Sequence, residues 1–381
     1  MMRRHLRIAL LCLLVVCNAG LFGATRPVIL GTHGVTASGH YLATLAGIRV
    51  MEQGGNAVDA GVAMVFAQNV LEPESCGFGG EVPILVYSAK DSKVHAISGQ
   101  GVAPRAATID WFKHNGFEKI PGDGFLPAVV PAVMDALALA LEHYGTMTLA
   151  QVMQPAIDLA EKGFPIGRSL QRGIGSVEDR FKSEWPSSAR VFLSGGKAPE
   201  FGDLLVQKDI ARTFQRIVAG ETEAKAKGRA LAIRAGRDVF YKGDVARKIV
   251  RFQRETRVKD ATGHTFSGLL SEADLAGYQG RIEEPITVNY RGIDVYKVGP
   301  WAQSPVFLQQ LNLLEGFDLK AMHHNSADYI HTVVEASKLA FADREAYYGD
   351  PEFVSVPLRG LLSKEYAAER RRLIAPHKAS L

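Results

Sequence analysis

Apolar residues recur at helical spacing on both sides of a glycine pair early in the chain. Residues 38–53 carry apolar side chains three or four positions apart, and residues 58–70 carry a second such run. Gly54-Gly55 separates the two runs, and a glycine beyond a helix end adopts the left-handed conformation at little steric cost. We expect Ser38 to cap the first helix and Asn56 the second. The pattern therefore predicts a closely packed helical hairpin.

Shorter runs with the periodicity of strands or of helices follow along the rest of the chain. Apolar and β-branched runs predict strands at 82–87, 93–98, 286–289 and 293–298. Helical spacing predicts helices at 109–113, 132–143, 149–162, 208–218, 305–314 and 327–348. A capping box formed by Ser271 and Asp274 predicts one more helix, which ends near Tyr278. No internal repeat or long linker interrupts the sequence, so we expect α/β layers with much helix.

Composition narrows the class of protein. Hydrophobic residues make up 47% of the 381 residues and charged residues 22%, which excludes a disordered chain. The formal charge is +4, and it falls to +1 without the three arginines near the N-terminus. This balance argues against a nucleic-acid partner. Basic residues at 221–237 are interspersed with acids and alanines, so we interpret that segment as a solvated helix face and not as an anion site.

The first 24 residues have the pattern of an export signal. Three arginines precede an apolar stretch at 8–16, which is too short to span a bilayer as an ordinary helix. Small residues before a polar segment place the cleavage site near residue 23 or 24. We therefore expect a signal peptide at 1–24, a domain at 25–381, and a periplasmic or extracellular location.

The cysteines offer little chemistry. Cys17 leaves a lipid anchor open as an alternative, although Val16 stands where lipoprotein signals have a small residue. Cleavage of the signal leaves Cys76 alone, so no internal disulfide is expected. We interpret Cys76 as a small buried residue, with a reactive thiol as the alternative. The glycine-rich segment 77–80 lacks the spacing and the following helix of a phosphate loop, and it favours a core turn.

Two clusters of ionisable residues are candidate sites. His331 and Glu335 share a helix face one turn apart, close to two further histidines, as metal ligands can. Hydrogen bonding on the helix surface is the alternative, and we favour it, so no metal or cofactor is predicted. Glu72 and Glu74 lie in a predicted loop, and proximity is the only feature that suggests acid–base chemistry for them.

Several short motifs occur in an order that resembles the gamma-glutamyltranspeptidase (glutathione hydrolase) family. They lie at 52–60, 79–80, 103–104, 144–146, 154–156, 240–243, 274–278, 341–344 and 349–351. Each motif is weak alone, but their joint order over more than three hundred residues identifies the chain as a divergent member. The resemblance implies an α/β fold, the αββα sandwich of the N-terminal-nucleophile hydrolases.

The resemblance also implies a precursor that cleaves itself into a large and a small subunit. In the family the small subunit begins with a threonine that attacks the γ-glutamyl carbonyl, and its own amino group serves as the base. This sequence matches the large subunit, so we expect an incomplete sandwich with no catalytic residue in this chain. We expect a small catalytic subunit as partner in a heterodimer, a small-molecule acyl substrate, and no activity for the chain alone.

One substrate-binding position is expected in the large subunit. The family has an arginine before its Ala-Pro pair that binds the substrate α-carboxylate, and Gln100 occupies that position here. Glutamine is uncharged and cannot replace the two-pronged contact of arginine. Arg105 is an alternative partner, although a surface role is favoured for it. Three functions therefore stay open: γ-glutamyl transfer or hydrolysis, a glutaryl or cephalosporin acylase activity, and an inactive truncated or binding-only relative.

Overall fold

The computed structural model describes residues 28–380, and it divides the chain into two compact units, Met1–Val35 and Thr36–Leu381. The described residues of the first unit contain no helix or strand. The predicted signal peptide at 1–24 lies outside the described residues. Among the residues that are described, no helix has both the length and the apolar character needed to cross a membrane.

The second unit holds the regular elements of the described chain. Its helices are α2 (Tyr41–Glu52), α3 (Ala57–Leu71), α4 (Pro73–Cys76), α5 (Ile109–His114), α6 (Val133–Tyr144), α7 (Leu149–Lys162), α8 (Arg168–Ser176), α9 (Glu178–Ser183), α10 (Pro186–Phe192), α11 (Lys208–Glu223), η1 (Lys225–Lys227), α12 (Arg229–Tyr241), α13 (Asp244–Glu255), α14 (Glu272–Gly277), α15 (Ser304–Leu314), α16 (Ala327–Tyr347), α17 (Leu358–Leu361) and α18 (Lys364–Arg371). Its strands are β1 (Ile84–Ser88), β2 (Lys93–Ile97), β3 (Phe164–Pro165), β4 (Leu204–Leu205), β5 (Val258–Lys259), β6 (Thr265–Phe266), β7 (Ile282–Glu283), β8 (Ile286–Tyr290) and β9 (Ile293–Lys297). The longer predicted elements are confirmed, with shifts at their ends.

The predicted helical hairpin is confirmed as α2 and α3. Gly54 has a φ of 91°, which only glycine adopts without strain, and Asn56 caps α3 in a capping box with Asp59. The predicted cap of α2 is wrong: His40 takes that position, and its Nδ1 accepts the N–H of Leu42 at 3.2 Å. Ser38 donates its hydroxyl to the carbonyl of His40 at 2.7 Å, so it supports the cap from two residues earlier.

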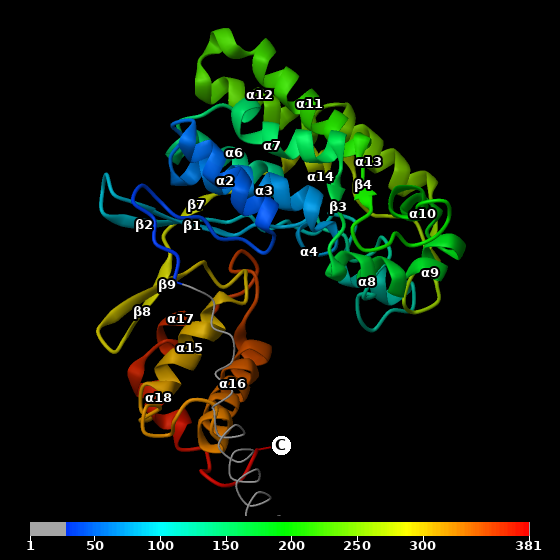
Figure 1. Ribbon diagram of the computed structural model, residues 1–381. Helices are drawn as coiled ribbons and strands as arrows, with labels where there is room; N and C mark the ends of the chain where they lie inside the picture. The colour runs from blue at the N-terminus through cyan, green and yellow to red at the C-terminus, as the bar shows by residue number, and fades with distance from the viewer. Residues whose placement is uncertain (1–27, 381) are drawn as a thin grey trace, which may run out of the picture. The chain divides into compact units, whose positions relative to one another are not determined.

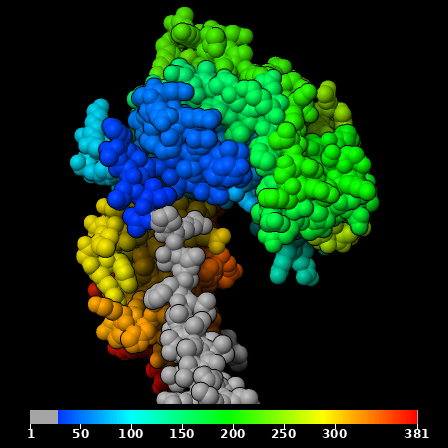
Figure 2. Space-filling model, viewed as in Figure 1, coloured from blue at the N-terminus to red at the C-terminus, as the bar shows by residue number. Residues whose placement is uncertain are grey.

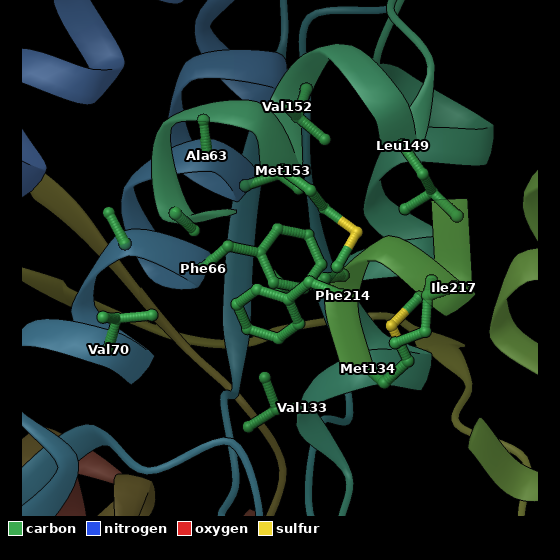
Figure 3. Packing of buried hydrophobic residues seen from close by; sticks show 14 of the residues in the cluster. Ala63, Phe66, Val70, Val133, Met134, Leu149, Val152, Met153, Phe214 and Ile217 are labelled. Atoms are coloured by element: carbon green, nitrogen blue, oxygen red, sulfur yellow. The ribbon is translucent and has the colours of Figure 1, made fainter. Parts of the chain in front are cut away.

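A layer of helices encloses the main hydrophobic core. Figure 1 shows α2, α3, α6 and α7 gathered on one side of the β1-β2-β7 sheet, and Figure 2 shows the blue hairpin packed against the green helices. Phe66 of α3 and Phe214 of α11 meet edge to face with ring centroids 5.7 Å apart, and Met153 of α7 lies beside them (Figure 3). All three side chains are buried, and each contributes on the order of 1.5–3 kcal/mol to folding.

The sheet is antiparallel with the strand order β1-β2-β7. Ile84 pairs with Ile97, and Ser88 pairs with Lys93, which confirms the predicted hairpin with β1 starting two residues later. Along β1 the side chain of Val86 is buried while Tyr87 is exposed, as expected for a sheet with one covered face. Strand β7 has only two residues, too few to give an alternating pattern, and the sequence did not predict it.

The later part of the chain forms a second, smaller cluster. Strands β8 and β9 pair through a turn in which Arg291 and Gly292 both have positive φ, the conformation of a tight two-residue hairpin. Helix α15 contacts both strands and packs on α16 and α18 (Figure 1). The buried apolar residues of this cluster are Val306, Leu313, Ala336, Ala340 and Ala367.

The prediction of a solvated helix face at 221–237 is correct only in part, since Lys225, Lys227 and Arg234 are exposed but the segment is not one helix. The chain turns within it, from the end of α11 through η1 into α12. Glu221 is buried and accepts the N–H groups of Leu149 and Ala150 at 2.7 and 2.9 Å, which caps the N-terminus of α7. Arg237 is also buried and forms an ion pair with Asp135. Both charges therefore have structural partners that are distant in sequence.

Candidate functional site

An open pocket of about 650 Å³ lies where the ends of β2 and β9 meet α15 and α16. Its volume falls within the usual range for small-molecule sites. The sequence-predicted residue Gln100 lines it, together with Glu81, Pro83, Lys297, Pro300, Trp301, Ala302, Gln303, Ser304, Phe307, Arg344, Tyr348, Gly349 and Asp350. The motif positions 344, 349 and 350 are therefore brought together with Gln100, although more than two hundred residues separate them in sequence.

Two glycines fix the backbone on either side of Gln100. A Cβ on Gly99 would lie 2.0 Å from the carbonyl oxygen of Val82, and one on Gly101 would lie 2.0 Å from that of Val130. Neither position accepts a side chain without movement of the neighbouring backbone. Since the N–H of Val82 also donates to the carbonyl of Gly99 at 2.8 Å, the segment is held closely at this edge of the pocket.

A buried polar network holds Gln100 from behind. The hydroxyl of Tyr278 donates to the Gln100 carbonyl at 2.8 Å, and the Tyr278 carbonyl accepts from the guanidinium of Arg237. Asp135 pairs with Arg237 at 2.5 Å and accepts the N–H of Gly280 at 2.6 Å. Burial, and then the negative charge of Asp135, raises the pKa of Tyr278 well above its ordinary value. Its hydroxyl therefore stays protonated and available as a donor at physiological pH.

Helix α16 forms another wall through the motif at 341–344. Arg344 lines the pocket, donates to the side chains of Gln303 and Glu345, and lies over the ring of Phe341 at 4.7 Å. The preceding residue, Asp343, is buried on another side of the helix and anchors it. Its carboxylate accepts from Gln309 of α15 at 2.9 Å and from Tyr366 and Arg370 of α18 at 3.0 and 3.1 Å.

The end of β9 and the loop after it supply a cationic and aromatic wall, and of its residues Lys297 was not predicted from the sequence. Trp301 donates its indole N–H to Glu283 at 2.8 Å, which fixes the ring at the pocket edge. The ammonium of Lys297 lies 5.8 Å from the ring centre of Phe307 on α15. Lys297 ends a strand two residues before the Gly299-Pro300 break, and that position was the signal in the sequence. With Glu81, Arg344 and Asp350, the pocket has charges of both signs.

The other sequence candidates lie away from this pocket. The side chain of Arg105 is 80% exposed, and its Nε is 3.9 Å from Asp274. Burial, and then the charges of Glu72 and Glu74, raises the pKa of Cys76, which makes its thiol a poorer nucleophile. The predicted loop is corrected at Glu74, which lies in helix α4, while Glu72 precedes that helix and accepts from Gln68 at 3.0 Å.

His331 and Glu335, the candidate metal ligands, bind separate partners instead of a common site. His331 contacts the carbonyl of Ala375 at 2.8 Å through Nε2, and Glu335 accepts from Ser380 and Lys338. Within residues 28–380, no group of three or more His, Cys, Asp or Glu side chains is arranged to hold a metal ion. These residues contact the C-terminal segment of the described chain instead.

The motifs at 52–60 and 144–146 contact each other and have a structural role. Asp59, fully buried in α3, accepts the N–H of Thr146 at 2.9 Å, its hydroxyl at 2.7 Å, and the N–H of Met147 at 3.0 Å. Asn56 donates to the carbonyl of Tyr144 at 2.7 Å. Burial alone would raise the pKa of Asp59, but these hydrogen bonds outweigh it and lower the pKa below its ordinary value. The hairpin motif therefore positions a loop and takes no part in the pocket.

Comparison with known proteins places this architecture in a family. The family model for gamma-glutamyltranspeptidase matches residues 43–381. The chain is 36% identical over 354 residues to the glutathione hydrolase proenzyme of Bacillus subtilis (strain 168), a match that covers 92% of this chain and 56% of that relative. The chain therefore spans little more than half of the relative's length.

Solved structures agree with the family model. The gamma-glutamyltranspeptidase of Helicobacter pylori has a TM-score of 0.81 at 32% identity, covering 93% of this chain and 95% of that one. The cephalosporin acylase of Bacillus halodurans has a TM-score of 0.81 at 32% identity, covering 94% of this chain and 62% of that one. The chain belongs to the gamma-glutamyltranspeptidase family and has its N-terminal-nucleophile hydrolase fold.

Proposed function

We propose that this chain is the large-subunit part of an enzyme that hydrolyses or transfers γ-glutamyl groups of glutathione-type substrates. The observation that carries the proposal is the 36% identity to a glutathione hydrolase proenzyme over 92% of the chain. In this proposal a small subunit of the same family completes a heterodimer and supplies an N-terminal threonine as nucleophile. The pocket around Gln100 binds the acyl group that the threonine attacks.

The chemistry of the pocket supports this division of labour. Tyr348 donates its hydroxyl to Gln309, and burial, followed by the charge of Asp343, raises the pKa of Tyr348 well above its ordinary value. A tyrosine in that state is a poor nucleophile near neutral pH. Within the described residues the pocket therefore offers polar contacts and charges for binding, while its hydroxyl groups have no base that activates them.

A second candidate is an acylase that removes glutaryl-type groups, and the similarity to a cephalosporin acylase supports it. A glutaryl group has the same terminal carboxylate as a γ-glutamyl group but no α-amino group, so the missing arginine weakens the carboxylate contact for both groups, and only the amino end distinguishes them. Gln100 removes a charge-assisted contact worth about 1.5–3 kcal/mol, or one to two decades in affinity. The cephalosporin acylase of Bacillus halodurans is a structural relative in which this alternative has a precedent.

Substrate comparison tests both candidates. The chain is produced together with a family small subunit that begins with threonine, and release of p-nitroaniline is measured from γ-glutamyl-p-nitroanilide and glutaryl-p-nitroanilide. The control replaces that first threonine with alanine. Faster release from the γ-glutamyl substrate supports the first candidate, and faster release from the glutaryl substrate supports the second. An assembled heterodimer that releases neither product contradicts both and favours an inactive or binding-only relative.

We also propose that the protein is exported to the periplasm or the cell exterior. The support is the basic and apolar pattern of residues 1–24. Cell fractionation followed by N-terminal sequencing tests this proposal. A mature chain in the exported fraction that starts near residue 24 or 25 supports it, and an unprocessed chain found in the cytoplasm contradicts it.

A further inference from the structure

The charged side chains of the pocket differ in whether they have hydrogen-bond or ion-pair partners. Arg344 is engaged by Gln303 and Glu345, and Asp350 accepts the N–H of Glu352 at 2.9 Å. Lys297 is half-buried, yet within residues 28–380 its ammonium has no hydrogen-bond or ion-pair partner. Lys297 is therefore a positive charge of the pocket that has no direct hydrogen-bond or ion-pair partner among the described residues, although the carboxylates of Glu81 and Asp350 line the same pocket.

Packing holds this charge at the pocket wall. Lys297 ends β9 and pairs with Ile286 of β8, and the next residue, Val298, is buried. The ring of Phe307 lies beneath the ammonium at 5.8 Å, on the helix that also lines the pocket. An aromatic face attracts a cation but leaves its hydrogen-bond donors free. A ligand with an anionic group is the natural partner for them.

We infer that Lys297 is the residue that binds the carboxylate of the acyl group, a task that the uncharged Gln100 cannot perform. This inference rests on the proposed function and names a specificity-determining residue for it. A lysine is a point charge with three rotatable donors, so it suits a single terminal carboxylate without demanding the fixed two-pronged geometry of arginine. The Gln100 side chain, whose residue lines the same pocket, can add a neutral hydrogen bond.

Pairing of variants with substrates tests the inference in the assembled heterodimer. Lys297→Met is expected to raise the KM for γ-glutamyl- or glutaryl-p-nitroanilide on the order of 10- to 100-fold, with kcat changed much less. Butyryl-p-nitroanilide lacks the carboxylate, so its KM is expected to stay the same. Lys297→Arg keeps the charge and is expected to retain most of the affinity. Lys93→Met, at an exposed position of β2, is the matched control.

Equilibrium binding separates this inference from the proposed function. Glutarate is titrated into the wild-type heterodimer and into the Lys297→Met variant by calorimetry, with no need for turnover. Loss of glutarate binding in the variant supports the inference even if no p-nitroanilide is cleaved, and in that case the proposed activity alone fails. Equal glutarate binding in both proteins overturns the inference, as does an equal rise in KM for the neutral butyryl substrate.

Discussion

The helical layer and the Gln100 pocket use polar residues in opposite ways. In the helical layer, Asp59 and Glu221 are buried, and their carboxylates accept backbone N–H groups of loops and helix ends. In the pocket, Lys297 and Arg344 stay accessible, and Lys297 has no described partner. Buried charges that are fully hydrogen-bonded stabilise one arrangement of the chain, whereas uncommitted charges are available to a ligand.

The two regions are nevertheless connected. The network of Asp135, Arg237 and Tyr278 begins among the helices and ends at the carbonyl of Gln100. Asp343 has a similar role in the smaller cluster. Its hydrogen bonds fix α16, and its neighbour Arg344 lines the pocket. The comparison teaches that buried hydrogen-bond networks position the pocket residues, either through a direct hydrogen bond, as for Gln100, or through the neighbouring residue, as for Arg344. Substitutions should therefore affect stability in the networks and binding in the pocket.

The largest effect is expected for Asp59→Ala. The change removes a buried carboxylate and leaves the donors of Thr146 and Met147 without their partner, which should lower the free energy of unfolding by about 3–5 kcal/mol. Urea denaturation of the full chain, followed by circular dichroism, measures it. Asp110→Ala, at an exposed position in α5, should cost less than about 0.5 kcal/mol. Equal losses for the two variants would refute the structural role of Asp59.

The next largest effect is expected for a buried arginine of α12, in comparison with an exposed arginine on the same helix. Arg237→Ala leaves Asp135 buried without its counter-charge and should cost about 3 kcal/mol of unfolding free energy. Arg234→Ala removes an ion pair with Glu142 in which the arginine side chain is 59% exposed, so it should cost at most about 1 kcal/mol. Denaturation of both variants under the same conditions provides the measurement. A smaller loss for Arg237→Ala would contradict the network.

Local signals were enough to predict the hairpin. The glycine pair and the Asn56 cap act within a few residues of themselves, so α2 and α3 were located correctly. For segment 221–237 the interpretation failed at Glu221 and Arg237, because Leu149 and Asp135, with which they pair, lie more than seventy residues away. A charge pattern on a helix indicates which residues share a face, but it does not reveal what packs against that face.

The pocket was predicted only in part for the same reason. Gln100 was found through the order of family motifs, and the structure places it in the pocket. Tyr278 and Lys297 reach the same place from later segments, and no spacing in the sequence relates them to Gln100. Their roles depend on tertiary contacts, namely the hydrogen bond to the Gln100 carbonyl and the approach to Phe307.

A smaller effect is expected where the network reaches the pocket. Tyr278→Phe removes the donor to the Gln100 carbonyl and should cost about 1 kcal/mol of unfolding free energy. In the active heterodimer it should raise the KM for γ-glutamyl-p-nitroanilide several-fold while kcat changes little, because Gln100 is positioned less well. Tyr87→Phe, at an exposed position in β1, serves as the control. An unchanged KM would limit Tyr278 to a role in stability.

The smallest effect is local and depends on pH. Glu335 of α16 accepts from Lys338 and from Ser380, and these hydrogen bonds lower its pKa to about 2 from an ordinary value of 4.5. A depressed pKa means that the contact is fully present above about pH 4.5 and is lost as the pH falls toward 2. Hydrogen exchange of the Ser380 N–H, which donates to Glu335 at 3.2 Å, should therefore be protected at pH 7 and, once corrected for the intrinsic rate, less protected near pH 2.5.

Two variants on α16 decide whether Glu335 holds the C-terminal segment of the described chain. Glu335→Gln removes the charge, so protection of the Ser380 N–H should already be low at pH 7 and should no longer depend on pH between 2 and 5. Glu345→Gln changes a carboxylate that is 70% exposed on the same helix, and protection of the Ser380 N–H should stay as in the wild type. If both variants retain wild-type protection, His331 and Lys338 hold the segment without Glu335, through the carbonyls of Ala375 and Ser380.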